Sequence, residues 1–167
     1  MSKLPKLPKL SKLAGPAGMR QLWGMLKRVP RGGKVMGTLI GRMAPYTGTI
    51  SPEILELDLG RSKVMMRDRK AVRNHLNCIH AIALMNLGEV ATGTAMMYSM
   101  PENARAIIVN LGMEYKKKAR GTLIAEATCP VPSSNEKKEY VFSADLKDAH
   151  GDVVATATAR WLVGPAS

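Results

Sequence analysis

Three polar side chains between residues 74 and 89 are of the types that act on carbonyl groups. Asn74 precedes His80 by six residues, and Glu89 follows His80 by nine. From Ile79 to about Met97 the sequence is otherwise mostly apolar or small, which predicts a buried helix. A histidine and a carboxylate in such a helix cost free energy unless partners compensate them or a function retains them. This segment is therefore the first candidate for a catalytic site.

Other kinds of chemistry have weaker support in the sequence. Cys78 could act as a nucleophile with His75 or His80 as its base, although a lone cysteine in an apolar context is more often a core residue. The histidines form no metal-ligand spacing with a third ligand, so we expect no metal and no cofactor. Cys78 and Cys129 are too few for a disulfide framework, which favours a reducing, cytoplasmic location.

The elements that would position these side chains can be located from periodicity and from turn residues. Amphipathic spacing of Met19, Leu22, Trp23 and Leu26 predicts a first helix. The expected helices cover residues 18–28, 34–43 and 79–98. The expected strands cover residues 50–59, 63–69, 105–115, 121–131, 140–147 and 153–163. This order predicts an α+β fold in which an antiparallel sheet of five to six strands wraps around one central helix, with extra helices at the N-terminus.

Alternation along two strands predicts which side chains face that helix. In the strand 105–115 we expect Ile107, Val109, Leu111 and Met113 on one face. In the strand 153–163 we expect one face to carry Val153, Ala155, Ala157, Ala159 and Trp161. These faces would supply the apolar inner layer of the sheet.

Positive charge is concentrated at the N-terminus. The net charge is +12, and residues 1–52 contain ten Lys or Arg and no acid, whereas the remainder contains 15 basic and 13 acidic residues. A nearly neutral main domain argues against nucleic-acid binding. We divide the chain into a basic flexible tail (1–17), a helical extension (18–48) and a main domain (49–167). Three interpretations of the tail stay open: a solvated segment, an organelle-targeting sequence, or a segment that contacts an anionic membrane surface.

The order of elements and the register of Asn74, His80 and Glu89 resemble the hotdog-fold thioesterases, in particular the phenylacetate-pathway (PaaI-like) type. That pattern has an Asn, then a His-Gly-Gly at the start of the central helix, and an acid nine residues after the His. The resemblance covers about residues 49–163. The chain also resembles a poorly characterised branch of putative thioesterases with extra N-terminal helices, through its segments 45–48 and 73–75.

This chain departs from the pattern at three positions. Ala81 and Ile82 replace the two glycines after the histidine, and Glu89 stands where Asp is commoner. Ile108 occupies the strand position that often offers a Ser or Thr to orient water. Asn110 is expected on the same face as Ile108 and is a candidate substrate contact.

The resemblance implies hydrolysis of acyl-CoA thioesters by a homodimer, or by a tetramer of two dimers. The amide of Ala81 at the helix N-terminus would polarise the carbonyl, with Asn74 or His80 as a second donor. Glu89 lies roughly 13 Å further along the same helix. The carboxylate would therefore act on a carbonyl held by the partner subunit, either by activating water or by direct attack.

Basic clusters are candidates for the phosphates of CoA. They comprise Lys116, Lys117, Lys118 and Arg120, and a second group of Arg67, Arg69, Lys70 and Arg73. Two other functions stay open: a catalytically weak hotdog module that binds acyl or lipid-like ligands, and a hydratase, which usually sets its His and acid further apart. Asn74, His80 and Glu89 also have purely structural interpretations, as a turn residue, a helix-terminal residue and a buried ion-pair partner.

Overall fold

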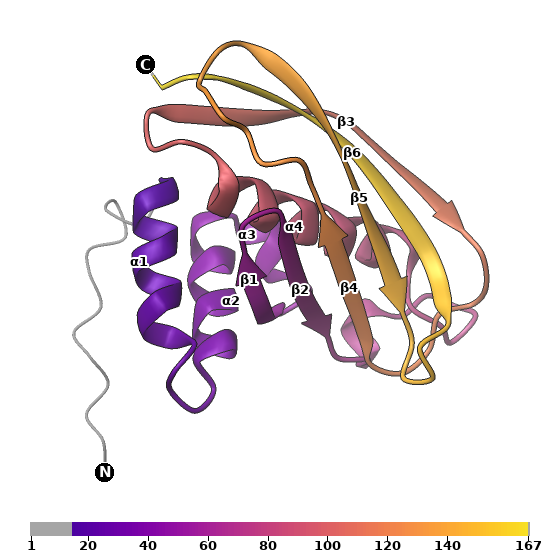
Figure 1. The fold of residues 1–167 in the computed structure, drawn as a ribbon. Helices are drawn as coiled ribbons and strands as arrows, with labels where there is room; N and C mark the ends of the chain where they lie inside the picture. Colours follow the sequence, from indigo (N-terminus) through magenta and orange to yellow (C-terminus); the bar gives the residue numbers. More distant parts are fainter. Residues whose placement is uncertain (1–14, 167) are drawn as a thin grey trace.

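The computed structural model describes residues 15–166. The helices are α1 (Pro16–Leu26), α2 (Gly32–Met43), α3 (Pro45–Gly48) and α4 (Ala81–Ser99), and a short 3₁₀ turn, η2 (Lys70–Val72), lies between β2 and α4. The strands are β1 (Glu53–Asp58), β2 (Arg61–Met66), β3 (Ala104–Tyr115), β4 (Leu123–Thr128), β5 (Lys138–Lys147) and β6 (Val153–Pro165). They form one antiparallel sheet in the order β1-β2-β4-β5-β6-β3, which curves around α4 (Figure 1). This is the hotdog fold, and the predicted α+β class is confirmed.

Helix α4 is buried on most of its circumference because the sheet surrounds it. Leu87, Ala91, Ala95 and Met96 are fully shielded from solvent. The sheet can approach closely because small residues face the helix: a Cβ placed on Gly88 would lie 2.5 Å from the Cβ of Ala157 on β6. The central helix therefore forms the centre of the hydrophobic core.

Within residues 15–166, no helix is long and apolar enough to cross a membrane.

Strand β3 departs from the predicted alternation because it contains a bulge. Ile108 lies opposite the buried Trp161 of β6, but the next paired residue, Asn110, lies opposite the exposed Arg160. The extra residue shifts the alternation, so Ile107 and Val109 are exposed while Leu111 faces inward. The predictions that Ile107 and Val109 share a face with Leu111, and that Ile108 and Asn110 share a face, are both wrong.

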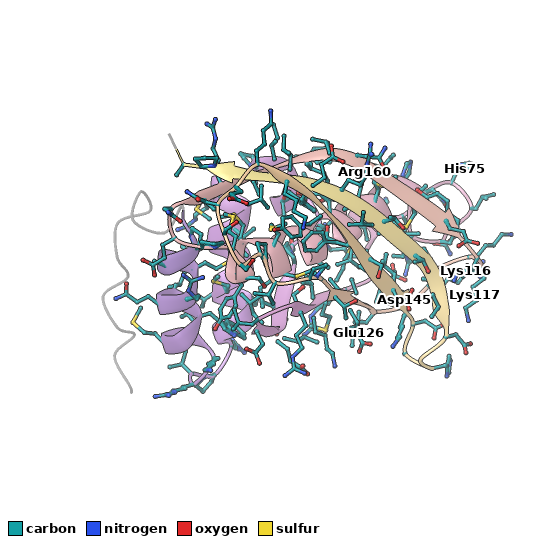
Figure 2. The ribbon with its side chains drawn as sticks, turned by 45° about the horizontal axis from the view of Figure 1, so that its top comes forward. His75, Lys116, Lys117, Glu126, Asp145 and Arg160 are labelled. Carbon is teal, nitrogen blue, oxygen red and sulfur yellow. The ribbon has the colours of Figure 1, made fainter. Side chains whose placement is uncertain are left out.

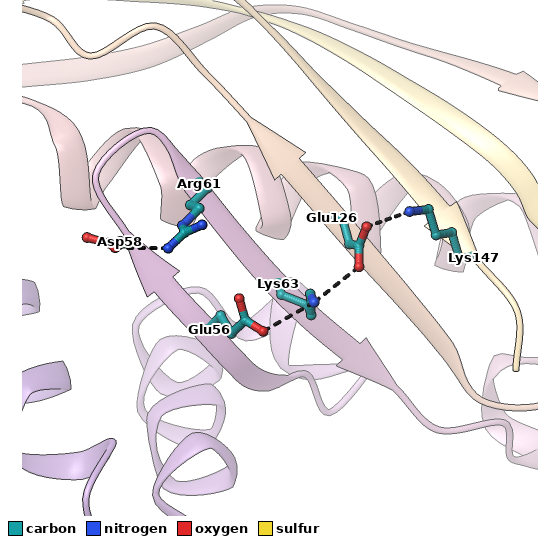
Figure 3. A network of polar contacts seen from close by, with 6 residues as sticks. All are labelled: Glu56, Asp58, Arg61, Lys63, Glu126 and Lys147. Carbon is teal, nitrogen blue, oxygen red and sulfur yellow. Dashed lines mark hydrogen bonds and ion pairs between the residues drawn. The ribbon is translucent and has the colours of Figure 1, made fainter. Parts of the chain in front are cut away.

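The outer face of the sheet is charged. A row of alternating charges crosses four strands: Lys63 lies 3.2 Å from both Glu56 and Glu126, and Glu126 lies 2.5 Å from Lys147 (Figure 3). The hydrogen bond from Lys147 is the main reason that the pKa of Glu126 is lowered. Exposed pairs of this kind contribute at most about 1 kcal/mol each. These charged side chains keep the outer face of β1, β2 and β4 in contact with solvent. The apolar side chains of these strands lie on the inner face, which packs in the core.

The N-terminal helices pack on the main domain. The predicted apolar stripe of α1 is confirmed, because Leu22, Trp23 and Leu26 are buried in the same cluster as residues of α4. The guanidinium of Arg20 donates to the carbonyls of Tyr98 and Met100 at 2.9 and 3.1 Å, which caps the C-terminal end of α4. Residues 1–14 of the predicted basic tail lie outside the described residues, and α1 begins at Pro16, a favoured first helical position.

Helix α2 rests on β1 through glycines. A Cβ placed on Gly37 would lie 1.8 Å from the carbonyl oxygen of Pro52, and one on Gly33 would lie 1.9 Å from that of Ile54. Backbone atoms cannot move aside as a flexible side chain does. The close contact between α2 and the edge of the sheet therefore requires glycine at both positions.

We expect Gly37→Ala to lower the stability of the protein by at least about 1–3 kcal/mol, the usual cost of overpacking. The matched control is Gly24→Ala in α1, where, apart from the helix's own backbone and the adjacent residues, no described atom lies within 4 Å of the added methyl group. That change should be neutral or should stabilise the helix by about 0.5–1 kcal/mol. Thermal unfolding followed by circular dichroism compares the two variants, and equal effects would contradict the described contact.

Candidate functional site

His80 begins the central helix and organises its first turn. Its backbone N–H donates to the carbonyl of Val72 at 2.8 Å, and its Nδ1 accepts the N–H of Ile82 at 3.0 Å. Because Nδ1 accepts a hydrogen bond, the proton of the neutral ring lies on Nε2. The side chain is exposed at the helix start, so Nε2–H is a donor available to a ligand.

The first amide of α4 is open. The N–H of Ala81 has no acceptor among the described residues, whereas the next amide, of Ile82, is occupied by His80. The carbonyl of Ala81 accepts from the hydroxyl of Tyr115, at the end of β3, at 3.2 Å. A helix N-terminus carries partial positive charge, so the amide of Ala81 and the Nε2–H of His80 offer two donors to a carbonyl oxygen.

Asn74 shapes the loop that leads into the helix. Its Oδ1 accepts from the N–H of Leu76 at 3.0 Å and lies 3.4 Å from the nitrogen and 3.3 Å from the Sγ of Cys78. Through these contacts the Asn74 side chain stabilises the turn of residues 74–78, a common role of asparagine in turns. Cys78 is buried beneath the turn, as expected for a core cysteine.

Glu89 is the unusual residue of the site. It lies on α4, partly buried, and it forms no ion pair with any described residue. Burial raises the pKa of its carboxyl group, and within residues 15–166 no neighbouring charge opposes that shift. A partly buried carboxylate that has no cation beside it among the described residues costs free energy.

Two adjoining hollows connect the helix start to Glu89. The first, of about 320 Å³, is lined by His80 and Arg73 among others, and the second, of about 270 Å³, is lined by Glu89 and Leu111. The two hollows share Tyr46, Ile82 and Asn86. The structure thus brings His80 and Glu89 to one continuous surface along α4 within a single subunit.

Asn86 is a residue of this surface to which the sequence assigned no role. Its Nδ2 donates to the carbonyl of Tyr46 at 3.0 Å and lies 3.4 Å from the Oγ1 of Thr49, so it fastens α3 to α4. The sequence did contain a signal for this role, because Asn86 is a polar residue three positions before Glu89 in an otherwise mostly apolar helix. The N-terminal extension therefore contributes one wall of the site, through Tyr46.

The predicted basic residues divide into engaged and exposed groups. Arg73 is held by Asp68 at 2.6 Å and by Asn77 at 3.0 Å, and Lys117 by Asp148 and Asp152 at 2.9 and 2.7 Å. Lys116, Lys118 and Arg120 are exposed.

The loop that carries this basic cluster lies at the helix start. The carbonyl of Ala119 accepts from the N–H of Ile79 at 2.9 Å, immediately before His80. Lys116 and Lys117 lie at the same end of the molecule as His75 of the preceding loop (Figure 2). Asn110, in contrast, lies on the outer side of the bulged strand and does not line either hollow.

We expect Glu89→Gln to raise the melting temperature by a few degrees at neutral and alkaline pH. The raised pKa of Glu89 means that the folded state binds this proton more tightly than the unfolded state does. Wild-type stability should therefore fall as pH rises from the ordinary glutamate range through the folded pKa, and the variant should escape that loss.

Glu126→Gln is the control with the opposite sign, because the pKa of Glu126 is lowered. Removal of that carboxylate should cost stability above its unfolded pKa, and the cost should vanish as pH falls. Melting temperatures between pH 4 and pH 9 test both variants. A pH-independent effect of Glu89→Gln would contradict the assignment.

Solved structures with the same fold include several proteins described as thioesterases. A structural-genomics protein, APC5556, is 30% identical, with a TM-score of 0.77 over 89% of this chain and 99% of its own. PA5026 from Pseudomonas aeruginosa, described as a probable thioesterase of unknown function, is 20% identical, with a TM-score of 0.71 over 83% of this chain and 97% of its own.

A variant of the thioesterase SAV0944 from Staphylococcus aureus is 15% identical, with a TM-score of 0.65 over 72% of this chain and 99% of its own. No curated protein matches the sequence. Residues 32–163 match a family described as a domain of unknown function, DUF4442. Because this match covers most of the chain, the chain belongs to the DUF4442 family. The matched region includes α2, α3 and the residues that line both hollows. Its hotdog fold is also that of solved structures described as thioesterases.

Proposed function

We propose that this protein hydrolyses acyl-CoA thioesters in a homodimer. The observation that supports this most strongly is the pairing, on one helix, of an open N-terminal amide with a desolvated carboxylate that has no cation. The amide of Ala81 suits an oxygen that gains negative charge. Glu89, whose pKa is raised by burial, is a stronger base than an exposed carboxylate and suits the role of a general base.

The reaction follows from these two groups. A water molecule gives a proton to the carboxylate of Glu89 while its oxygen bonds to the thioester carbon. The negative charge that develops on the carbonyl oxygen is stabilised by the N–H of Ala81, with Nε2–H of His80 as a second donor. Collapse of this intermediate breaks the C–S bond, and the thiolate of CoA leaves and takes up a proton.

Two subunits share the reaction because of the length of the helix. Ala81 and Glu89 are eight residues apart, about 12 Å along α4, which is too far for both to act on one carbonyl. A partner can supply the second group if the two β3 edges pair. Strand β3 is a free sheet edge of 12 residues with Ile107 and Val109 exposed at 63% and 42%, features that favour association over solvation.

The exposed cations suit the phosphates of CoA. Lys116, Lys118 and Arg120 lie in the loop that is hydrogen-bonded to the residue before His80, so phosphate contacts there would direct the acyl chain toward the helix start. Arg73 is held by Asp68 and has its position fixed at the edge of the first hollow. Asn110 stays outside this path.

We expect thiol release from a panel of acyl-CoAs of graded chain length, and loss of at least about 100-fold in kcat for Glu89→Gln because a general base contributes that much or more. The matched control is Glu126→Gln, which removes a carboxylate of the outer sheet face and should leave kcat unchanged. Free thiol is measured by a chromogenic disulfide reagent.

Absence of turnover above background on every acyl-CoA would contradict the hydrolase. Calorimetric binding of a non-hydrolysable acyl-CoA by an inactive wild type would identify the alternative, a module that binds acyl ligands. Turnover that Glu89→Gln leaves intact would contradict the role of the carboxylate.

A further inference from the structure

The helical layer formed by α1 and α2 carries positive charge that it does not balance itself. Residues 15–52 contain no Asp or Glu. Two of their cations are engaged, because Arg20 contacts the end of α4 and Lys27 lies within electrostatic reach of Asp58. The remaining four are exposed and form no ion pair with any described residue. We call these four the basic patch: Arg28, Arg31, Lys34 and Arg42.

The basic patch lies on the outer side of a fixed support. Lys34, Thr38 and Arg42 follow one another at intervals of four residues, so they share one face of α2. The opposite face is buried through Met36 and Leu39, and glycines hold the helix against β1. Arg28 and Arg31 extend the patch into the loop between α1 and α2, which lies at the lower end of both helices in Figure 1.

A hollow of about 230 Å³ lies between the two cations of α2. It is lined by Lys34, Arg42 and Ser51 together with Thr38, Pro52 and three glycines, and none of the described residues that line it is acidic. The hydroxyl of Ser51 accepts from the guanidinium of Arg69 at 3.3 Å, so its own proton is available to a ligand. Two cations and a hydroxyl donor around one hollow suit a phosphate group.

Apolar side chains stand among these cations. Pro30 is exposed between Arg28 and Arg31, and Met43, next to Arg42, is 39% exposed. No aromatic residue occurs between residues 28 and 43 to stack on nucleic-acid bases. Cations mixed with small apolar side chains suit the boundary between headgroups and acyl chains of a lipid bilayer.

We propose that the basic patch docks this protein on an anionic lipid surface, with one headgroup phosphate held between Lys34 and Arg42. The charge of the patch complements anionic lipids, and no acid of the same layer opposes it. This docking does not depend on the proposed hydrolysis, so either one can fail while the other holds.

Vesicle co-sedimentation of the full chain tests the docking. We expect binding to vesicles of phosphatidylcholine mixed with anionic phosphatidylglycerol, none to phosphatidylcholine alone, and a loss of binding as salt rises. The triple variant Arg28→Gln, Arg31→Gln and Lys34→Gln should lower the partition coefficient by about 100-fold, because each cation near such a surface contributes roughly fivefold. Circular dichroism should show wild-type melting, since these side chains are exposed and have no ion pair among the described residues.

The matched control removes three exposed cations elsewhere, by Lys116→Gln, Lys118→Gln and Arg120→Gln. Figure 2 shows Lys116 at the other end of the molecule from the helical layer. This variant has the same net charge as the first and should keep most of the binding. Equal losses in the two triple variants would show attraction by net charge alone and would overturn the patch.

A wild type that ignores anionic vesicles also overturns the docking, and so does one that binds a DNA duplex instead. Four substitutions of lysine by glutamine at positions 3, 6, 9 and 12 test the N-terminal segment. If they abolish binding while the patch triple variant keeps it, the segment and not the patch holds the membrane.

Two double variants test the phosphate seat. Lys34→Gln with Arg42→Gln removes both cations of the hollow, whereas Arg28→Gln with Arg31→Gln removes two cations of the loop. Both lose the same charge, so a seated phosphate predicts a larger loss of binding to anionic vesicles for the first pair. Equal losses overturn the seat.

Discussion

The desolvation of one carboxylate connects the main features of this protein. Helix α4 is enclosed by the sheet, so almost every position on it must be apolar or small. Glu89 breaks this rule, since no cation in the described part of the chain compensates it, and burial raises the pKa of its carboxyl group. The hollow beside it is the observation that supports its proposed chemical use.

The N-terminal helices belong to the site as well as to the core. Helix α2 is held against β1 by glycines, and α3 is fastened to α4 by Asn86. Through these contacts Tyr46 forms a wall of both hollows. The extension is therefore coupled to the region of Glu89, and the family match beginning at residue 32 includes the helices that make this wall.

The sequence predicted the fold well because its strongest patterns are those that burial enforces. The apolar run after His80 and the alternating alanines of β6 follow directly from a sheet wrapped around one helix. The bulge in β3 could not be predicted, because one inserted residue leaves no local signature in Ile108-Val109-Asn110. Asn110 was misplaced for that reason.

The division of labour between two subunits is the central claim, and complementation between variants tests it most directly. Ala81→Pro removes the open amide at the first helical position, where proline is tolerated and where the extended backbone of His80 already suits it. The Glu89→Gln variant removes the base. If the site takes its amide from one subunit and its carboxylate from the other, each homodimer is inactive, but refolded mixtures hydrolyse acyl-CoA well above the sum of the two parents. Mixtures that exchange subunits yet stay as inactive as the parents would contradict the account.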